Sequence, residues 1–426
     1  MTTDRRKILF LCPSAWDHVQ LAASRTLPRH RYDLRFIAEE AEDYPAQFDA
    51  LGFIDQMVRA CRASPVDGVA TSSDYPGAIV AAAIAREVGL PAPAPQAVLR
   101  CSHKYYSRLA QYEAVPEATP RFALVRPGHL SPQALGLDYP LFVKPVKSWF
   151  SILAARMENA TQLAAFLESP AVRQHLTEFV GPFNRLVRRY TDFDYDGSYL
   201  IAEELLHGSQ VTVEGYVFQG EVSILGVVDS VMFPGTISFQ RFEYPSSLPE
   251  AVQARMGSIA ARVMQHIGFD NGLFNIEMFY DAARDAIRII EINPRMCGQF
   301  ADLMESVNGT NTYEILLSIA CGERPQPRRR QGRFAMAASF PLREFQDKRV
   351  TRVPTDDDIA RVKEALPVTL VKRYYREGQR LSDVPDNSDG LTWRHAVINM
   401  AGHDRASLLR DFDEALRRLS FGLEAV

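Results

Sequence analysis

Cysteine is scarce in this sequence, and its five cysteines lie far apart. None of them forms a C-x-x-C pair, the spacing that zinc sites and redox-active dithiols commonly use. An odd and scattered set also argues against a disulfide framework. We therefore expect a protein of a reducing compartment without structural zinc.

Long hydrophobic runs are lacking as well. The longest, Ala78 to Ala85, is far shorter than the roughly 20 apolar residues that cross a bilayer. The first residues, Met1 to Lys7, are polar, and no signal-peptide core follows them. These features predict a soluble, cytoplasmic protein with no membrane partner.

Neither sign of charge is in large excess. The 48 basic and 52 acidic side chains give a formal net charge of -4. A protein whose main partner is a nucleic acid usually carries a basic excess, so the balance predicts no nucleic-acid partner. A local site for an anionic small molecule remains compatible with this charge.

Several short motifs of well-known enzyme classes are absent. No G-x-G-x-x-G follows the first predicted strand, and the chain contains no Walker A loop, no G-x-S-x-G and no H-E-x-x-H. Dinucleotide-dependent enzymes, P-loop NTPases, α/β-hydrolases and zinc proteases of these types therefore receive little weight.

The first part of the chain alternates strand and helix patterns. With 426 residues the chain is long enough for two or three domains. Short apolar runs at residues 8–11, 32–37 and 68–71 predict strands, and helical patterns start at Ala15 and Gly77. This alternation predicts a doubly wound α/β domain, which binds ligands at the carboxyl ends of its strands. Asp74 lies at such an end and could contact a substrate, although helix capping by the 72–76 segment is the favoured interpretation.

Two stiff connectors divide the rest of the chain. Leu90–Pro95 is rich in proline, and Arg324–Arg333 is rich in proline and arginine and is interpreted as a solvated turn. They delimit domains at 1–95, 96–325 and 326–426. A capped helix from Ser102 to Glu113 carries Lys104, strand patterns dominate after residue 199, and a helix from about Asp404 to Leu419 ends an α+β region.

The most informative segment is a predicted hairpin with acidic side chains. Strand patterns at residues 273–280 and 287–293 flank a charged turn. Because side chains alternate along a strand, a turn centred near residue 283 or 284 makes Glu277 and Glu291 direct or diagonal neighbours. Two such carboxylates repel each other unless a cation lies between them, and together with the Asn293 amide they suit magnesium. Arg295, two residues further on, could bind phosphate or carboxylate through its planar fork.

Two weaker signals precede the hairpin. An apolar strand ends at Lys144-Pro145, and a lysine at the buried end of a strand must find an anion unless its stem extends to the surface. Residues 200–214 read as strand, short linker and strand, with Glu203 and Glu204 at the linker.

In combination and in this order, these segments resemble the ATP-grasp superfamily, over most of the chain. The resemblance implies a two-subdomain ATP-grasp fold after the doubly wound domain, with a lid at about 115–205 and a C-terminal region that completes the core. It implies ATP contacts from Lys104, Lys144, Ser151, Glu203, the 204–206 backbone (Glu204, Leu205, Leu206) and Gln210. It also implies magnesium, or manganese in its place, on Glu277, Glu291 and Asn293, catalytic roles for Lys144 and Arg295, and substrate contacts from Arg241, Arg295, Gly298 and Asp74.

Three positions depart from the family pattern. The loop Val146–Ser151 contains no glycine, whereas the family usually has a glycine-rich loop here. Gln210 replaces an acid that usually binds ribose, and Arg241 is the candidate substitute for a lysine found in many relatives. A surface arginine packed among Phe239, Phe242 and Tyr244 is the alternative for that position.

The resemblance implies an ADP-forming ligase that joins a small-molecule carboxylate to an amine through an acyl phosphate. Glu214-Gly215 and the Ile292–Arg295 segment look most like the branch of amino-acid ligases that make dipeptides. A bicarbonate-activating carboxylase of the same superfamily and a non-catalytic ATP-binding regulator stay open as alternatives, and a homodimer is compatible with each of them.

Overall fold

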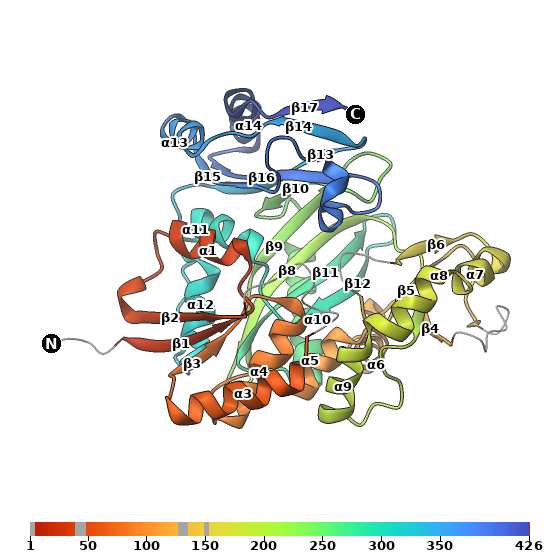
Figure 1. Ribbon diagram of the computed structural model, residues 1–426. Coiled ribbons are helices and arrows are strands. Elements are labelled where there is room, and N and C mark those ends of the chain that lie inside the picture. Colours follow the sequence, from red (N-terminus) through yellow and green to blue (C-terminus); the bar gives the residue numbers. More distant parts are fainter. Residues whose placement is uncertain (1–4, 39–47, 127–134, 149–152) are drawn as a thin grey trace.

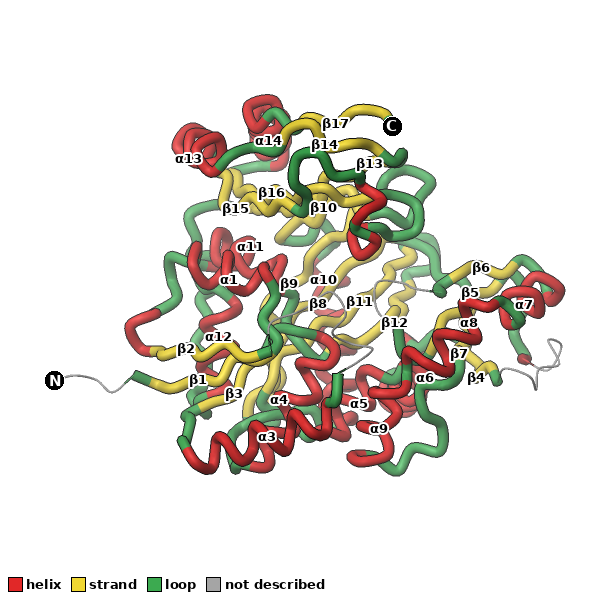
Figure 2. Tube along the Cα trace, viewed as in Figure 1, coloured by secondary structure: helices red, strands yellow, loops and turns green. Residues whose placement is uncertain are grey.

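The computed structural model describes residues 5–38, 48–126, 135–148 and 153–426 (Figure 1). Within these residues the strands form sheets of three, four and eight strands and a separate two-stranded ribbon. Figure 2 shows how helices lie over these sheets, with the four-stranded unit projecting from the body of the molecule. Among the described helices, none combines the length and the apolar character that a bilayer crossing requires.

The N-terminal sheet is parallel, as the alternation of strands and helices predicts. Its strands are β1 (Arg6–Leu11), β2 (Tyr32–Ile37) and β3 (Gly68–Ala70), in the order β2-β1-β3. The helices of this part are α1 (Ala15–Ala23), α3 (Ala50–Ala63) and α4 (Ile79–Glu87). Residues 8–11 are buried without alternation, the pattern of a parallel strand covered on both faces.

The favoured capping role of the 72–76 segment is wrong. A π-helical turn, η2 (Asp74–Ala78), leads into α4, and no side chain caps either element. The Ser72 hydroxyl instead donates to Asp17 on α1. Asp74 is thereby left for partners outside the helix, which are described below. Likewise, Ser102 does not cap the helix that carries Lys104: it ends α5 (Pro95–Ser102), and α6 (Lys104–Ala114) starts after His103.

The four-stranded sheet is antiparallel and small. Its order is β4-β7-β5-β6, formed by β4 (Phe122–Val125), β7 (Leu200–Glu204), β5 (Leu141–Pro145) and β6 (Ala155–Met157). The helices α7 (Ala160–Leu167) and α8 (Pro170–Gln174) pack on it, whereas α9 (Gly181–Tyr190) packs into the core that contains α4 and α5. Leu141, Val143 and Leu200 form part of its own apolar core. This sheet therefore lies in the range that the resemblance assigns to the lid.

The eight-stranded sheet is the largest sheet of the described residues, and its order is β12-β11-β8-β9-β10-β13-β16-β15. Its first five strands are β12 (Ala286–Asn293), β11 (Gly272–Asp281), β8 (Ser209–Phe218), β9 (Glu221–Met232) and β10 (Phe239–Tyr244). The remaining three come from the C-terminal region: β13 (Met336–Glu344), β16 (Trp393–Gly402) and β15 (Val368–Arg373). Because β13 pairs with β10, the C-terminal region extends the central sheet across the second predicted connector.

Helices cover this sheet and complete the C-terminal region. They are α10 (Glu250–Ile267), α11 (Ala301–Asn308), α12 (Thr312–Ala320), α13 (Asp356–Ala365) and α14 (Arg405–Leu419). The two-stranded ribbon is β14 (Lys348–Arg352) with β17 (Gly422–Ala425). Asp404 caps α14, and this helix ends at Leu419 as predicted for the last helix.

The apolar core crosses the first predicted connector without a break. Ile84 of α4, Leu99 of α5, Met264 of α10 and Phe274 of β11 belong to one cluster of buried side chains. Burial of such side chains stabilises by about 1.5–3 kcal/mol each. This packing holds the carboxyl edge of the N-terminal sheet against the end of β12, which is where the candidate site lies.

Candidate active site

The acidic hairpin has the predicted register. Glu277 lies directly opposite Glu291, and Asn275 lies opposite Asn293. Burial and the charge of Glu291 raise the pKa of Glu277 to about 7. Burial opposes ionisation of Glu291 too, but Lys104 and Lys144 outweigh it and lower the pKa of that carboxyl. The pair therefore concentrates negative charge that a cation would relieve.

The remaining contacts of the hairpin leave ligand atoms for a divalent cation. Gln210 Nε2 donates to Glu277 Oε2 at 2.9 Å, and Asn293 Nδ2 donates to Asn275 Oδ1 at 3.2 Å, so within the described residues the side-chain Oδ1 of Asn293 has no hydrogen-bond donor and could bind a metal. Within the described residues, no group of three or more His, Cys, Asp or Glu side chains could cage an ion. Two carboxylates and one amide oxygen fit magnesium, which fills its other positions with water and phosphate oxygens.

Cations from three parts of the chain converge on this hairpin. Lys104 Nζ, at the start of α6, lies 3.5 Å from Glu291 Oε2. Arg295 Nη2 and Lys147 Nζ lie 3.7 and 3.5 Å from the two oxygens of Asp74. Burial disfavours the Asp74 carboxylate, yet Lys147, Arg295 and Lys104 lower its pKa. The arrangement is a cluster of cations in which Asp74 and Glu291 each have at least one cationic partner.

Lys144 is buried and forms an ion pair with Glu203. Its Nζ lies 2.9 Å from Glu203 Oε2, and Arg108 Nε donates to Glu203 Oε1 at 2.7 Å. These three side chains are only 7, 5 and 2% exposed, so the surface alternative for Lys144 is wrong. Both oxygens of Glu203 are occupied, and Arg108 and Lys144 lower its pKa to about 2 against the effect of burial.

Replacing Glu203 with glutamine should destabilise the fold by about 3–5 kcal/mol, because two buried cations would lose their counter-charge. Urea denaturation at pH 7 measures the change. The folded-state pKa of Glu203 lies below its unfolded value, so its contribution should be complete above about pH 4.5 and disappear toward pH 2. Glu117→Gln, which breaks an exposed pair with Arg262, should cost less than about 1 kcal/mol. An equally small loss for Glu203→Gln would contradict this account.

Glu214 is a buried carboxyl between the hairpin and Arg295. Glu214 is on β8 and lies opposite Asn275 of β11. It accepts a hydrogen bond from the Asn275 amide and is fully buried. Burial raises its pKa to about 7, although Asn275 and Arg295 act in the opposite direction. Its ionised form is therefore disfavoured in the folded chain.

The pKa of Glu214 predicts a pH-dependent effect of Glu214→Gln. A raised folded-state pKa gives stability that is complete below the unfolded pKa and is lost as pH rises through about 7. Relative to the unmodified protein, Glu214→Gln should therefore be more stable by on the order of 2 kcal/mol at pH 8, and the difference should vanish near pH 5. Urea midpoints at both pH values test this, with exposed Glu221→Gln as the control that should stay flat. A pH-independent difference would refute it.

The linker between the two antiparallel sheets completes the cleft. Leu205 and Leu206 follow β7 and precede β8, so they connect the four-stranded sheet to the eight-stranded one. The Glu204 carboxylate pairs with Arg121 at 3.2 Å and lies 3.8 Å from Arg288. Gly298 starts a short 3-10 turn, η6 (Gly298–Phe300), where an added Cβ would lie 3.0 Å from the Tyr313 hydroxyl. Glycine therefore permits a close approach behind Arg295.

Not every predicted site residue reaches the cleft. Arg241 donates to Glu243, which also accepts from Arg405 of α14 at 3.2 Å. Glu243 lies opposite Ala338, a core residue on the side of the sheet that faces α13 and α14. The structure thus places Arg241 with α14 and not with the hairpin. Ser151 and the central part of the glycine-free loop lie outside the described residues.

Sequence reasoning overlooked Lys147 and Arg108. Lys147 follows Lys144 by three residues, and Arg108 lies one helical turn after Lys104. The spacing of Arg108 could have been noticed as a second cation on the same face of the helix. Nothing local indicates that Lys147 is buried against Tyr75 and Phe183, with its Nζ 5.0 and 5.6 Å from the ring centres.

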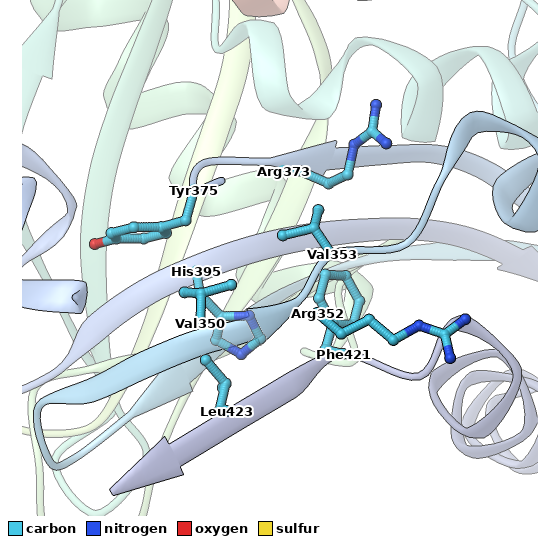
Figure 3. Close-up of a pocket in the computed structure, with 8 residues that line it drawn as sticks. All are labelled: Val350, Arg352, Val353, Arg373, Tyr375, His395, Phe421 and Leu423. Atoms are coloured by element: carbon cyan, nitrogen blue, oxygen red, sulfur yellow. The ribbon is translucent and has the colours of Figure 1, made fainter. Parts of the chain in front are cut away.

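Two cavities help to delimit the site. One of about 60 Å3 lies between β3, α4 and the end of β12, and its lining includes Thr71, Pro294 and Arg295, which places it at the carboxyl edge of the N-terminal sheet. The other, in the C-terminal region, has about 10 Å3, room for about one water (Figure 3). It is lined by valine, leucine and aromatic side chains with two arginines, and it lies apart from the acidic hairpin.

Comparisons with known proteins agree with this geometry. Residues 137–303 match the model of the ATP-grasp domain. The ATP-grasp enzyme fsqD of Aspergillus fumigatus is 23% identical over an alignment of 413 residues, which covers 85% of this chain and 67% of that protein.

Solved structures match over nearly the whole chain. An L-amino acid ligase from Bacillus licheniformis superposes with a TM-score of 0.71 at 18% identity, covering 99% of both chains. A biotin carboxylase from Campylobacter jejuni gives 0.66 at 14%, covering 99% of this chain and 93% of that one. An N5-carboxyaminoimidazole ribonucleotide synthetase from Thermotoga maritima gives 0.65 at 13%, covering 99% and 100%. The predicted fold is confirmed by these superpositions, and the match over residues 137–303 supports the resemblance to the ATP-grasp superfamily.

Proposed function

We propose that this protein is an ATP-dependent ligase that joins a small-molecule carboxylate to an amine. A carboxylate oxygen takes the γ-phosphoryl group of ATP, the bond from the γ-phosphorus to the bridging oxygen breaks, and ADP leaves. The amine nitrogen then attacks the acyl carbon, phosphate departs, and the nitrogen loses a proton. The products are an amide, ADP and phosphate.

The facing carboxylates of Glu277 and Glu291, with Lys104 and Arg295 beside them, carry this proposal. Glu277, Glu291 and Asn293 would hold magnesium or manganese, and such an ion neutralises charge on phosphate oxygens when bound. Phosphoryl transfer needs positioning and charge neutralisation more than a nucleophilic side chain. Lys104, Lys147 and Arg295 supply fixed positive charge for that purpose.

The glutamine at position 210 fits a nucleotide site next to an acidic pair. Its amide nitrogen donates to Glu277, and its carbonyl oxygen is left to accept from a ribose hydroxyl. A carboxylate here would add a further negative charge beside Glu277, whose pKa is already raised. We propose that ATP binds between the two antiparallel sheets, with the 204–206 backbone along the adenine. Glu203 acts by holding Lys144 and Arg108 in place.

Asp74 gives the N-terminal domain a role at the substrate side. Its carboxylate is held by Arg295 and Lys147 at the carboxyl edge of the N-terminal sheet. A substrate carboxylate could take its place on Arg295, and Asp74 would then be available to the ammonium group of the second substrate. This exchange would couple binding of the acid to binding of the amine.

Bicarbonate activation is the second candidate. The biotin carboxylase and the N5-carboxyaminoimidazole ribonucleotide synthetase superpose nearly as well as the L-amino acid ligase. A regulator that binds ATP without turnover is disfavoured, because a binder has less need of the paired carboxylates.

A phosphate-release screen distinguishes the three functions. Pairs of carboxylic acids and amines are incubated with ATP, magnesium and the protein, and a parallel arm contains bicarbonate alone. Phosphate release that needs both an acid and an amine supports the ligase. Release with bicarbonate alone supports the carboxylase, and tight ATP binding with no ADP formed in any mixture supports the regulator. Glu291→Gln serves as the inactive control for every arm.

A further inference from the structure

Two arginines face each other in the C-terminal part of the central sheet. Arg343 of β13 and Arg394 of β16 are direct cross-strand partners. The Arg343 side chain is only 8% exposed, and the Nε atoms of both arginines are buried without a hydrogen-bond partner. Like charges directly opposite on two strands destabilise the pair, and an unmet buried donor adds to that cost. The arrangement calls for an anion.

Only one of the two arginines has a carboxylate partner within the described residues. Arg343 Nη1 donates to Asp389 at 2.8 Å and to Thr392 at 2.9 Å, whereas Arg394 forms no ion pair there. The Arg394 guanidinium lies 4.5 Å from the centre of the Tyr374 ring. Lys372 Nζ lies 5.0 Å from the same ring and 4.6 Å from the Trp16 ring. There is therefore one aspartate for the cluster of two facing arginines and the aromatic rings beside them.

The cluster lies on the face of the sheet that points toward the candidate site. Arg373, Tyr375 and His395 line the small cavity in Figure 3, beside β14 and β17. Because side chains alternate along a strand, Lys372, Tyr374 and Arg394 point to the opposite face.

On that opposite face Gln299, which follows the hairpin in the chain, contacts the two strands that carry the arginines. Gln299 Nε2 donates to Ser339 on β13 at 2.8 Å, and its carbonyl accepts from Asn399 on β16 at 3.1 Å. Gln299 follows Arg295 by four residues in the chain. Arg343 follows Ser339 by four residues on β13, a separation of about 13 Å along the strand. Trp16 belongs to the first turn of α1, behind the carboxyl end of β1. The cluster thus lies on the sheet face that Gln299 contacts, and it is next to α1 through Trp16.

We propose that Arg343 and Arg394 form a binding site for a carboxylate or phosphate group, carried by a substrate at the end remote from its reacting group. A planar guanidinium binds such groups through two parallel hydrogen bonds, and the anion would remove the repulsion between the two arginines. The rings of Tyr374 and Trp16 offer an apolar wall for the chain that bears the anion. Assigning the anion to a substrate rests on the proposed ligase function, whereas anion binding itself does not.

Thermal unfolding without nucleotide tests the site. The melting temperature is measured against inorganic phosphate, and separately against acetate, at ionic strength held constant with potassium chloride. A saturable rise is expected for the unmodified protein, for Arg295→Met and for Arg373→Met, the last removing a neighbouring arginine from the opposite face. Arg394→Met and Arg343→Met should lose the response, with anion Kd raised about tenfold or more.

If Arg343→Met folds poorly, Arg394→Met alone tests the anion site. Asp389 keeps its ion pair with Arg343 in the Arg394→Met variant. Methionine retains an unbranched chain against Tyr374, so Arg394→Met should melt at the same or a higher temperature than the unmodified protein in chloride. An unchanged anion response in Arg394→Met would overturn the proposal. A large drop in its melting temperature in chloride would also overturn it, because the arginine would then be structural.

Steady-state kinetics with the substrate pair found by the phosphate-release screen separates the two sources of the anion. If a substrate carries it, Arg394→Met should raise the KM of that substrate about tenfold or more and leave the KM of ATP unchanged. If both KM values stay unchanged, the anion belongs to a free effector and the assignment to a substrate is overturned. A screen without any ligase activity would refute the proposed function alone, since the thermal arm still reports on the site.

Discussion

Replacing Glu291 with glutamine should lower ATP turnover by about a hundredfold to a thousandfold. Glu291 faces Glu277 across the hairpin and lies 3.5 Å from Lys104, so it links the proposed ion to the cationic side of the cleft. A glutamine keeps the shape and removes the charge. Loss of one preorganised charge contact at a phosphoryl-transfer site typically costs this much in rate.

The same variant should change stability little. Neutralising Glu291 removes its repulsion of Glu277, but it also removes the counter-charge of Lys104 and Lys144, which lower the pKa of Glu291. We expect a melting temperature close to that of the unmodified protein, together with weaker magnesium binding by isothermal calorimetry. Glu221→Gln, a strand carboxylate of the same sheet that pairs with Arg324 on the surface, should leave rate and magnesium affinity unchanged. Full turnover by Glu291→Gln would remove the basis for the proposed metal site.

Replacing Arg295 with alanine should also reduce turnover by about a hundredfold or more. Its guanidinium follows the hairpin directly, lies 3.7 Å from Asp74 and is about one-fifth exposed, so it can reach a substrate from a partly dry position. Arg295→Lys should recover little of the loss, since an ammonium cannot form two parallel bonds to a phosphate or carboxylate.

Stability should survive this change because Lys147 remains as the partner of Asp74. Phosphate release at saturating ATP and varied acid concentration measures the effect, and circular dichroism verifies the fold. Arg284→Lys is the matched control, an arginine of the same hairpin that pairs with Asp281 in the exposed turn. Unchanged turnover in Arg295→Ala would exclude the role assigned to this residue.

The local parts of the site were predictable because each depends on a short stretch of chain. The register that brings Glu277 and Glu291 together follows from alternation along two strands and from one short turn. Lys144 at the end of β5 had to find a counter-charge wherever the chain placed it, because a buried ammonium is costly without one. The parallel N-terminal sheet followed from the spacing of its apolar runs.

Contacts between distant segments were not predictable from such patterns. The resemblance implies an ATP contact for Glu203, yet Arg108 and Lys144 occupy both of its oxygens. The sequence pattern favoured a helix-capping role for the segment that contains Asp74. The ion pair of Asp74 with Arg295 joins residues that are more than two hundred positions apart in the chain. Arg241 read as a substrate contact, and pairing of β10 with β13 holds it near α14.

Residue type and spacing by themselves determined the fold class, the acidic hairpin and the cations that accompany it, since periodicity and the cost of buried charge act over a few residues. Only the tertiary structure decided which cation meets which anion. It joined the C-terminal strands to the central sheet and thereby brought Arg343 opposite Arg394. Those choices depend on packing between segments far apart in the chain, because sheet order and core packing select among many pairings that local pattern leaves equivalent.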